Sequence, residues 1–209
     1  MSTVGVTDGS LTSLLVGRMK AYSDLVKFRL SALVTFSAVF EIDKKALFFL
    51  NNLGSEQWDG FWLAITKQFY WAPFFAVLFY LLIKKIGWKQ FGFFVLFLAL
   101  LIVATDQITN LFKFSFERLR PCNDPAVKDY IRVVQERVSY SFFSGHASNS
   151  FASTTFFFLI FRKYYRFGLL LFLFPLVFAY SRIYLGLHFP SDILAGYIFG
   201  LFTGTLFYR

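Results

Sequence analysis

Three short motifs in the second half of the chain hold the side chains that could do chemistry. They are Lys113 with Arg120-Pro121, then Ser144-Gly145-His146, then Ser181-Arg182 with His188 and Asp192. Together they contain both histidines of the chain. Cations and free backbone N–H groups bind phosphate, and an unprotonated imidazole can attack phosphorus. The combination predicts a phosphate site with its own nucleophile.

The first motif is a pair of cations at the end of an apolar run. Lys113 and Arg120 are seven residues apart, which equals about two helical turns. Both side chains are therefore expected on one helix face, and Pro121 prevents that helix from continuing. Taken alone, such a pair more often anchors a helix to lipid headgroups. The other motifs favour a shared phosphate instead.

The second motif is expected at the start of a helix, because a long apolar segment follows it. Free N–H groups there can point at phosphate oxygens, and Gly145 lets an anion approach the backbone closely. A lone histidine in this position is more often an interfacial hydrogen-bonding residue than a catalyst. We interpret His146 as catalytic only because His188 accompanies it.

The third motif contains the expected nucleophile. His188 follows Arg182 by six residues and precedes Asp192 by four. Asp192 can therefore accept a hydrogen bond from Nδ1–H of His188, which leaves Nε2 unprotonated and stabilises the imidazolium formed on attack. The alternative is that Asp192 only caps a helix beginning near Pro190. Taken in isolation, the pair favours neither interpretation.

The composition places these motifs in a membrane. The 209 residues are 57% hydrophobic and 22% aromatic, more than a soluble core of this size can bury. The net charge is +9, but its basic residues form short clusters between apolar runs without a nucleic-acid-binding motif. We therefore expect a membrane and a phosphorylated lipid as partners, and no nucleic acid. The single cysteine, Cys122, excludes an internal disulfide and a cysteine-based metal site, and no cofactor is expected.

Five apolar stretches predict an all-α, polytopic membrane fold with five to six transmembrane helices. They cover residues 61–83, 90–112, 147–161, 167–187 and 193–208. Nothing in them alternates with a period of two, and a bilayer requires every backbone group to pair internally. Several have uncharged cores of only 15 or 16 residues, so polar ends must complete the spans. The last stretch allows a close helix approach through Gly196, Gly200 and Gly204.

Basic loops predict the orientation. The cations that connect or follow the apolar stretches are Lys84, Lys85 and Lys89, then Arg162, Lys163 and Arg166, then Arg209. The positive-inside rule places them in the cytoplasm and all three motifs on the external face, which is periplasmic if this is a bacterial inner membrane. The loop at 113–146 is also basic, and we interpret several of its cations as ligand-binding.

Two segments have the pattern of amphipathic interfacial helices. The first covers residues 41–53, and the second, weaker one covers residues 127–138. The apolar face of the first comprises Ile42, Ala46, Phe49, Leu50 and Leu53. Either segment is expected to be a packing element or a lid, with packing the preferred interpretation.

The motifs follow the order Lys-x6-Arg-Pro, Ser-Gly-His and Ser-Arg-x5-His-x3-Asp. On these residues the chain resembles the type 2 phosphatidic acid phosphatase family of integral membrane lipid phosphatases, over about residues 41–209. The resemblance implies a six-helix membrane core and metal-independent cleavage of a phosphomonoester or diphosphate through a phosphohistidine. Phe143 stands where many members have proline, but every polar group of the motif is present.

The resemblance also implies a role for each motif residue. His188 is the nucleophile, Asp192 orients it, and His146 is the general acid for the leaving oxygen. The implied phosphate cradle comprises Lys113, Arg120, Ser144, Gly145 and Arg182. Candidate substrates are undecaprenyl diphosphate, lipid A phosphate, phosphatidylglycerol phosphate and phosphatidate, and the first two are favoured for a Gram-negative host.

Two other functions fit the sequence less well. A vanadate-dependent haloperoxidase has a similar cradle, but the membrane spans argue against it. A lipid-binding or transport protein without turnover is disfavoured by the intact His146, His188 and Asp192.

Residues 1–40 have no assigned role. Within them, Lys27-Phe28-Arg29-Leu30 weakly resembles the first segment of heme-farnesylating prenyltransferases, so these residues could be a foreign N-terminal piece. The expected lipid phosphatase domain is therefore residues 41–209.

Overall fold

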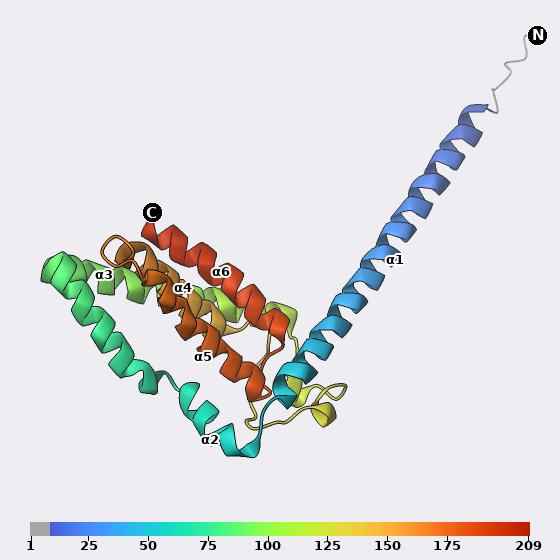
Figure 1. Cartoon of the computed structure of the whole chain (residues 1–209). Helices are drawn as coiled ribbons and strands as arrows, with labels where there is room; N and C mark the ends of the chain where they lie inside the picture. The colour runs from blue at the N-terminus through green and yellow to red at the C-terminus, as the bar shows by residue number, and fades with distance from the viewer. Residues whose placement is uncertain (1–8) are drawn as a thin grey trace, which may run out of the picture. The chain divides into compact units, whose positions relative to one another are not determined.

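A computed structural model describes the backbone of residues 9–209, with the side chains of residues 38–209 and several before them (Figure 1). The described part is helical and contains no strand, which confirms the all-α prediction. Its order is α1 (Gly9–Asn52), α2 (Glu56–Ile65), η1 (Gln68–Trp71), α3 (Ala72–Phe116), η2 (Pro121–Asn123), η3 (Lys128–Tyr130), α4 (Gly145–Phe161), η4 (Gly168–Phe172), α5 (Leu173–Tyr184) and α6 (Pro190–Tyr208).

The chain divides into two compact units, residues 1–42 and 43–209, and the second holds all three motifs. The expectation of a distinct N-terminal segment over residues 1–40 stays a prediction. Its part on residues 1–8 lies outside the described residues.

α4 and α6 lie against each other at very short range, and the three glycines of α6 make this contact. A Cβ atom added to Gly200 would lie 2.6 Å from the carbonyl oxygen of Ser148, and one added to Gly204 would lie 2.5 Å from that of Ala152. Only a residue without a Cβ fits at such backbone distances. The four-residue spacing of the glycines therefore brings the second and third motifs, at the starts of α4 and α6, to the same end of the helix pair.

α3 reverses direction at Gly87, whose φ of 77° and ψ of 167° lie outside the helical range. A positive φ is readily available only to glycine. Figure 1 shows the two arms of α3 on either side of this turn. Phe94 of the second arm stacks on Phe156 of α4, with ring centroids 5.4 Å apart, in the buried core that these helices share.

The first predicted apolar stretch, 61–83, is wrong as a single helix. The chain leaves the helical conformation after Ile65, where Lys67 is extended, and α3 begins at Ala72. Pro73 lies in the first turn of α3, where a missing N–H does no harm, whereas in a helix interior its ring would clash with the preceding turn. The other stretches match the second arm of α3, α4, η4 with α5, and α6.

The predicted amphipathic helix over residues 127–138 is also wrong. The structure has a single 3-10 turn at Lys128–Tyr130 and then extended backbone at Ile131. The N–H of Tyr130 closes the turn on the carbonyl of Val127 at 3.0 Å, and later backbone groups bond to other parts of the chain. The N–H of Arg132 donates to Oδ1 of Asn51 at 2.7 Å, and that of Gln135 donates to the carbonyl of Leu185 at 3.3 Å. These outside partners take the place of an internal helical ladder.

Residues 41–52 are helical as predicted, but the buried face is not the apolar one. Asp43, Leu47 and Asn51 are buried at four-residue spacing, whereas Ile42 and Phe49 are 66% and 68% exposed. The buried polar groups have specific partners elsewhere in the second unit. The apolar face is free to meet lipid.

Large apolar side chains also cover the outside of the bundle. On α6, Leu194, Ile198 and Phe202 are each at least 60% exposed. Water does not solvate such a continuous helical face favourably, and lipid does. Among the described residues one helical stretch, Gln68–Asn123, is long and apolar enough to cross a membrane, and Gly168–Tyr184 is a shorter apolar helix.

The glycine contact predicts the effect of adding one methyl group. Gly200→Ala should lower the stability of the purified protein by about 1–3 kcal/mol, because the methyl group meets backbone atoms that cannot rotate away. Gly92→Ala is the matched control, since a Cβ there meets nothing within 4 Å. Thermal unfolding of both variants in one detergent checks this. A Gly200→Ala protein as stable as Gly92→Ala would contradict the close approach.

Candidate active site

α3 ends at Phe116, so Arg120 is not on the same helix face as Lys113, and the predicted face-sharing is wrong. Glu117 takes a left-handed conformation with φ of 48°, and its N–H donates to the carbonyl of Lys113 at 3.0 Å, which closes the helix. α3 therefore ends before Pro121, and the proline does not cause its end. Arg120 follows in extended backbone and reaches the site from the loop.

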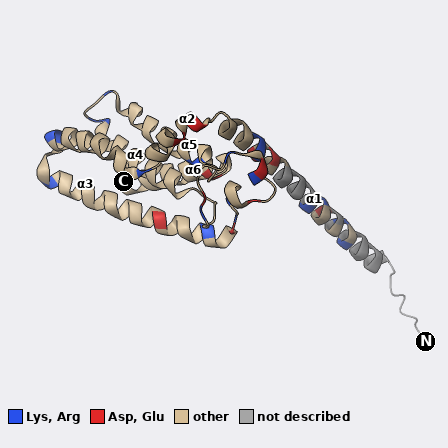
Figure 2. Cartoon of the chain, turned by 90° about the horizontal axis from the view of Figure 1, so that it is seen from below, with Lys and Arg blue, Asp and Glu red and all other residues tan. Residues whose placement is uncertain are grey.

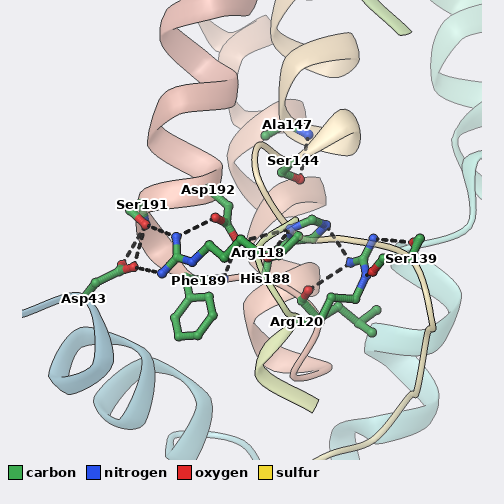
Figure 3. A network of polar contacts seen from close by, with 12 residues as sticks. Asp43, Arg118, Arg120, Ser139, Ser144, Ala147, His188, Phe189, Ser191 and Asp192 are labelled. Carbon is green, nitrogen blue, oxygen red and sulfur yellow. Dashed lines mark hydrogen bonds and ion pairs between the residues drawn. The ribbon is translucent and has the colours of Figure 1, made fainter. Parts of the chain in front are cut away.

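His188 lies in the short segment between α5 and α6 and is 2% exposed. Its Nε2 is 2.9 Å from Nη1 of Arg120 (Figure 3). Because a guanidinium only donates, Nε2 must accept this hydrogen bond, which places the proton on Nδ1. This is the tautomer expected from the His–Asp spacing. Burial and then the nearby Arg120 and Arg182 hold the pKa of His188 well below its usual value, so the ring is neutral at pH 7.

Asp192 both caps α6 and faces His188, so the two interpretations of the third motif hold together. Its Oδ2 accepts the N–H of Phe189 at 2.9 Å, which satisfies the helix start, and lies 3.4 Å from Nδ1 of His188. The same oxygen accepts a hydrogen bond from the hydroxyl of Ser141. Asp192 is fully buried, so it depends on these donors for its charge.

Arg118 is the main functional candidate that the motif analysis missed. Its Nη1 donates to Oδ1 of Asp192 at 2.7 Å, and its Nη2 donates to Oδ2 of Asp43 at 2.7 Å. Asp43 in turn accepts the N–H of Ser191 at 2.8 Å (Figure 3). Arg118 was one of several loop cations without a motif. A sequence signal for its partner does exist. Asp43, Leu47 and Asn51 follow one another at four-residue spacing, and this helical period marks the face on which Asp43 is buried.

The second motif begins α4 as predicted. Ser144 is the N-cap, its Oγ accepts the N–H of Ala147 at 3.4 Å, and its carbonyl accepts that of Ser148. The N–H groups of Gly145 and His146 have no hydrogen-bond partner among the residues that the structure describes. A Cβ at Gly145 would lie 3.6 Å from Nζ of Lys113, so the cation of the first motif reaches the N-terminus of this helix.

The side chains around the second motif hold its position. The ring of His146 stacks on Phe178, with centroids 5.2 Å apart. Phe143, which departs from the family pattern, is buried between Phe112 of α3 and Phe199 of α6. An aromatic contact thus anchors the loop where many members have proline.

Two arginines of the cradle are buried without an acidic partner in the described part of the chain. Arg120 is 3% exposed and bonds to neutral groups, the backbone and hydroxyl of Ser139 and the carbonyl of Leu187, besides His188. Arg182 is 1% exposed, donates to Oγ1 of Thr66 at 2.6 Å, and has a buried Nε without a partner.

An uncompensated buried charge is unfavourable by several kcal/mol, and an anion in the site relieves it. Burial lowers the pKa of Arg120 only to about 10, so the guanidinium stays charged at neutral pH. Among the described residues no cluster of His, Cys, Asp or Glu could hold a metal ion. The site therefore suits an oxyanion held by cations and backbone N–H groups.

Known proteins are similar to this chain in sequence. The sequence model of the PAP2 superfamily matches residues 94–209. A lipid A 4'-phosphatase of Bacteroides thetaiotaomicron is 38% identical over 172 residues, which cover 80% of this chain and 76% of that protein. A lipid A 4'-phosphatase of Porphyromonas gingivalis is 33% identical over 175 residues, which cover 82% of this chain and 73% of that protein. The chain belongs to the PAP2 superfamily, as the three motifs predict, and is a lipid phosphate phosphatase.

Two crystal structures share the fold. A transmembrane PAP2-type phosphatidylglycerolphosphate phosphatase of Bacillus subtilis aligns with a TM-score of 0.63 and 19% identity, covering 81% of this chain and 84% of that one. LpxE of Aquifex aeolicus aligns with a TM-score of 0.59 and 23% identity, covering 78% of this chain and 92% of that one. Together with the exposed apolar faces, this fold makes the chain a membrane protein.

The unpaired cations predict binding of a free oxyanion. Orthovanadate, which resembles phosphate in shape and charge, should raise the melting temperature by about 5–10 °C at 100 times its Kd. Arg182→Gln should abolish the shift because it removes a buried ligand-binding cation. Arg132→Gln is the control, since Arg132 is already paired with Asp59 at 3.0 Å. A shift of equal size in both variants would contradict an oxyanion site at Arg182.

Proposed function

We propose that the protein removes a phosphate group from lipid A through a phosphohistidine at His188. The single observation that carries the chemistry is the position of Nε2 of His188, unprotonated and 2.9 Å from Arg120, beside cations that have no acidic partner among the described residues. The substrate is supported by the lipid A 4'-phosphatase of Bacteroides thetaiotaomicron, which is 38% identical to the chain.

Lys113, Arg120 and Arg182, together with the N–H groups of Gly145 and His146, hold the phosphoryl oxygens in this proposal. Arg120 transfers its hydrogen bond from Nε2 of His188 to a phosphoryl oxygen, which frees the lone pair for attack. Positioning and charge neutralisation then supply most of the rate enhancement.

Nε2 of His188 attacks phosphorus in line, and the bond between phosphorus and the lipid oxygen breaks. His146 donates a proton to that departing oxygen, and the ionised Asp192 stabilises the imidazolium side of the phosphohistidine. Water then attacks phosphorus with His146 as the base, the P–N bond breaks, and inorganic phosphate leaves. Ser144 contributes by capping the helix whose N–H groups bind the phosphate.

The proposed location is the inner membrane of a bacterium with the site on the periplasmic face. The two arms of α3, α4, α5 with η4, and α6 would provide five spans. Figure 2 shows Lys and Arg gathered where α3 turns, the end expected in the cytoplasm. Residues 41–209 would form the phosphatase domain. α2 and residues 41–52 would lie at the external interface.

Undecaprenyl diphosphate, phosphatidylglycerol phosphate and phosphatidate remain competing substrates, because the cradle contacts the phosphate they share. The Bacillus subtilis phosphatidylglycerolphosphate phosphatase, at 19% identity, supports a common fold and not a common substrate. A vanadate-dependent haloperoxidase has less support, since both similar curated relatives are phosphatases.

Initial rates on the four lipids in one detergent system test the substrate. Lipid A phosphate should be hydrolysed fastest, and His188→Ala should abolish turnover on every lipid because no other side chain provides the attacking nitrogen. A mock preparation from cells that lack the protein measures contaminating phosphatase, and its rate is subtracted from all the others. Faster hydrolysis of another lipid would overturn the substrate, and an active His188→Ala protein would overturn the mechanism.

The dependence of kcat/KM on pH tests the His188–Asp192–Arg118 chain. His188 must be neutral to attack, and its pKa is lowered, so its protonation should set the acid limb of the profile. Arg118→Gln should lower kcat by about 10- to 100-fold through misplacement of Asp192, and should move the acid limb to higher pH by removing a nearby cation. Arg118→Lys should restore part of both effects. An unmoved limb would assign Arg118 a purely structural role, since ionisation of the substrate is common to all variants.

A further inference from the structure

A cavity lies at the opposite end of the helix bundle from the phosphate site. We call it the turn groove and define it by Lys85, Gln90, Phe93, Phe97, Tyr164 and Arg209 among its lining residues, with a volume of about 730 Å³. α4 and α6 both start at the phosphate site and end at this groove. The 17 residues of α4 separate the two by about 25 Å. The volume is in the range of small-molecule sites.

The walls and floor of the turn groove are aromatic. Phe94 and Phe156 lie stacked and buried beneath it, each 4% exposed. Phe93 and Phe97 of α3 are 57% and 45% exposed along its side, and Tyr164 closes it near the end of α4 at 44% exposed. A hydrocarbon chain fits this surface, because its burial against the rings removes apolar area from water.

Two cationic side chains, Lys85 and Arg209, line the polar end of the groove beside the neutral amide of Gln90. Residues 84–105 contain no acid, and residues 155–209 contain only Asp192, which is at the phosphate site. The cations here contact aromatic rings instead: Nζ of Lys85 is 5.7 Å from the ring of Tyr165, and Nζ of Lys163 is 5.3 Å from that of Tyr208. Within the described part of the chain, neither Lys85 nor Arg209 forms an ion pair with an acidic side chain.

We propose that the turn groove binds an anionic phospholipid of the cytoplasmic leaflet. Its phosphate pairs with Lys85 and Arg209, and one acyl chain lies along Phe93 and Phe97. A phosphodiester such as phosphatidylglycerol has the required net negative charge, whereas the cationic amine of a zwitterionic headgroup is repelled by the same side chains. Both histidines are at the other end of the bundle, so the lipid is bound here and not hydrolysed.

A second copy of the chain is a poorer occupant. Two copies meeting through this surface would bring Lys85, Arg209 and their neighbouring cations together, and like charges repel at such an interface. A lipid phosphate neutralises the same cluster. The bound lipid would also connect the turn of α3 to the end of α6.

Native mass spectrometry of the full chain in a neutral detergent tests the proposal with defined lipids. Phosphatidylglycerol should bind at least about 10-fold more tightly than phosphatidylcholine of the same acyl chains. The double variant Lys85→Gln with Arg209→Gln should lose this preference. Lys84→Gln with Arg166→Gln is the matched control: it removes the same charge from the same end, at residues that do not line the groove.

Each outcome decides the proposal. Preference lost only in the groove variant supports it, and equal loss in both variants assigns the effect to general surface attraction. Equal binding of the two lipids by the wild-type protein overturns the proposal, and no variant is needed for that result. A dimer whose formation excludes phosphatidylglycerol also overturns it. Binding is measured in His188→Ala as well, so the result is independent of the proposed phosphatase mechanism.

Discussion

Arg118 occupies the two buried carboxylates nearest the phosphate site, and the electrostatics of the site depend on this. It holds Oδ1 of Asp192 and Oδ2 of Asp43, each at 2.7 Å. Arg120 and Arg182 are therefore left with neutral partners only within the described residues. An anion offsets the unfavourable charge of a buried cation cluster, and the proposed phosphate would bind more tightly for this reason.

The same contacts orient His188, the proposed nucleophile. With Oδ1 of Asp192 bonded to Arg118, Oδ2 faces Nδ1 of His188 and the helix start, and Arg120 selects the tautomer from the other side of the ring. Glycine contacts between α4 and α6 bring the helix starts together beneath these loops. Helix packing thus places the backbone, and buried ionic hydrogen bonds set the side-chain directions.

The two ends of the bundle differ in how they balance charge. At the phosphate end, Arg118 pairs with Asp43 and Asp192. Arg120, which has no acidic partner among the described residues, bonds to His188. At the turn of α3, the cations have aromatic neighbours and no acid, which suits a lipid phosphate at the membrane surface. In the two proposals together, a reacting phosphate and a structural phosphate bind about 25 Å apart, and only the first lies beside a histidine.

The sequence alone predicted the chemistry from residue types and their order in three motifs, which comprise Lys113, Arg120, Ser144, Gly145, His146, Arg182, His188 and Asp192. Spacing alone misplaced Arg120, which reaches the site from the loop after α3. Apolar runs determined the all-α fold. The helix stop at Glu117, the irregular loop at 127–138 and the Asp43–Arg118 pair came only from the tertiary structure. The partners of the loop and of Asp43 lie far away in sequence, 81 residues for Arg132 and Asn51 and 148 for Asp43 and Ser191, and a local pattern carries no information on such partners. The stop at Glu117 is a local bond to Lys113, but it depends on a left-handed backbone conformation that the residue type does not predict.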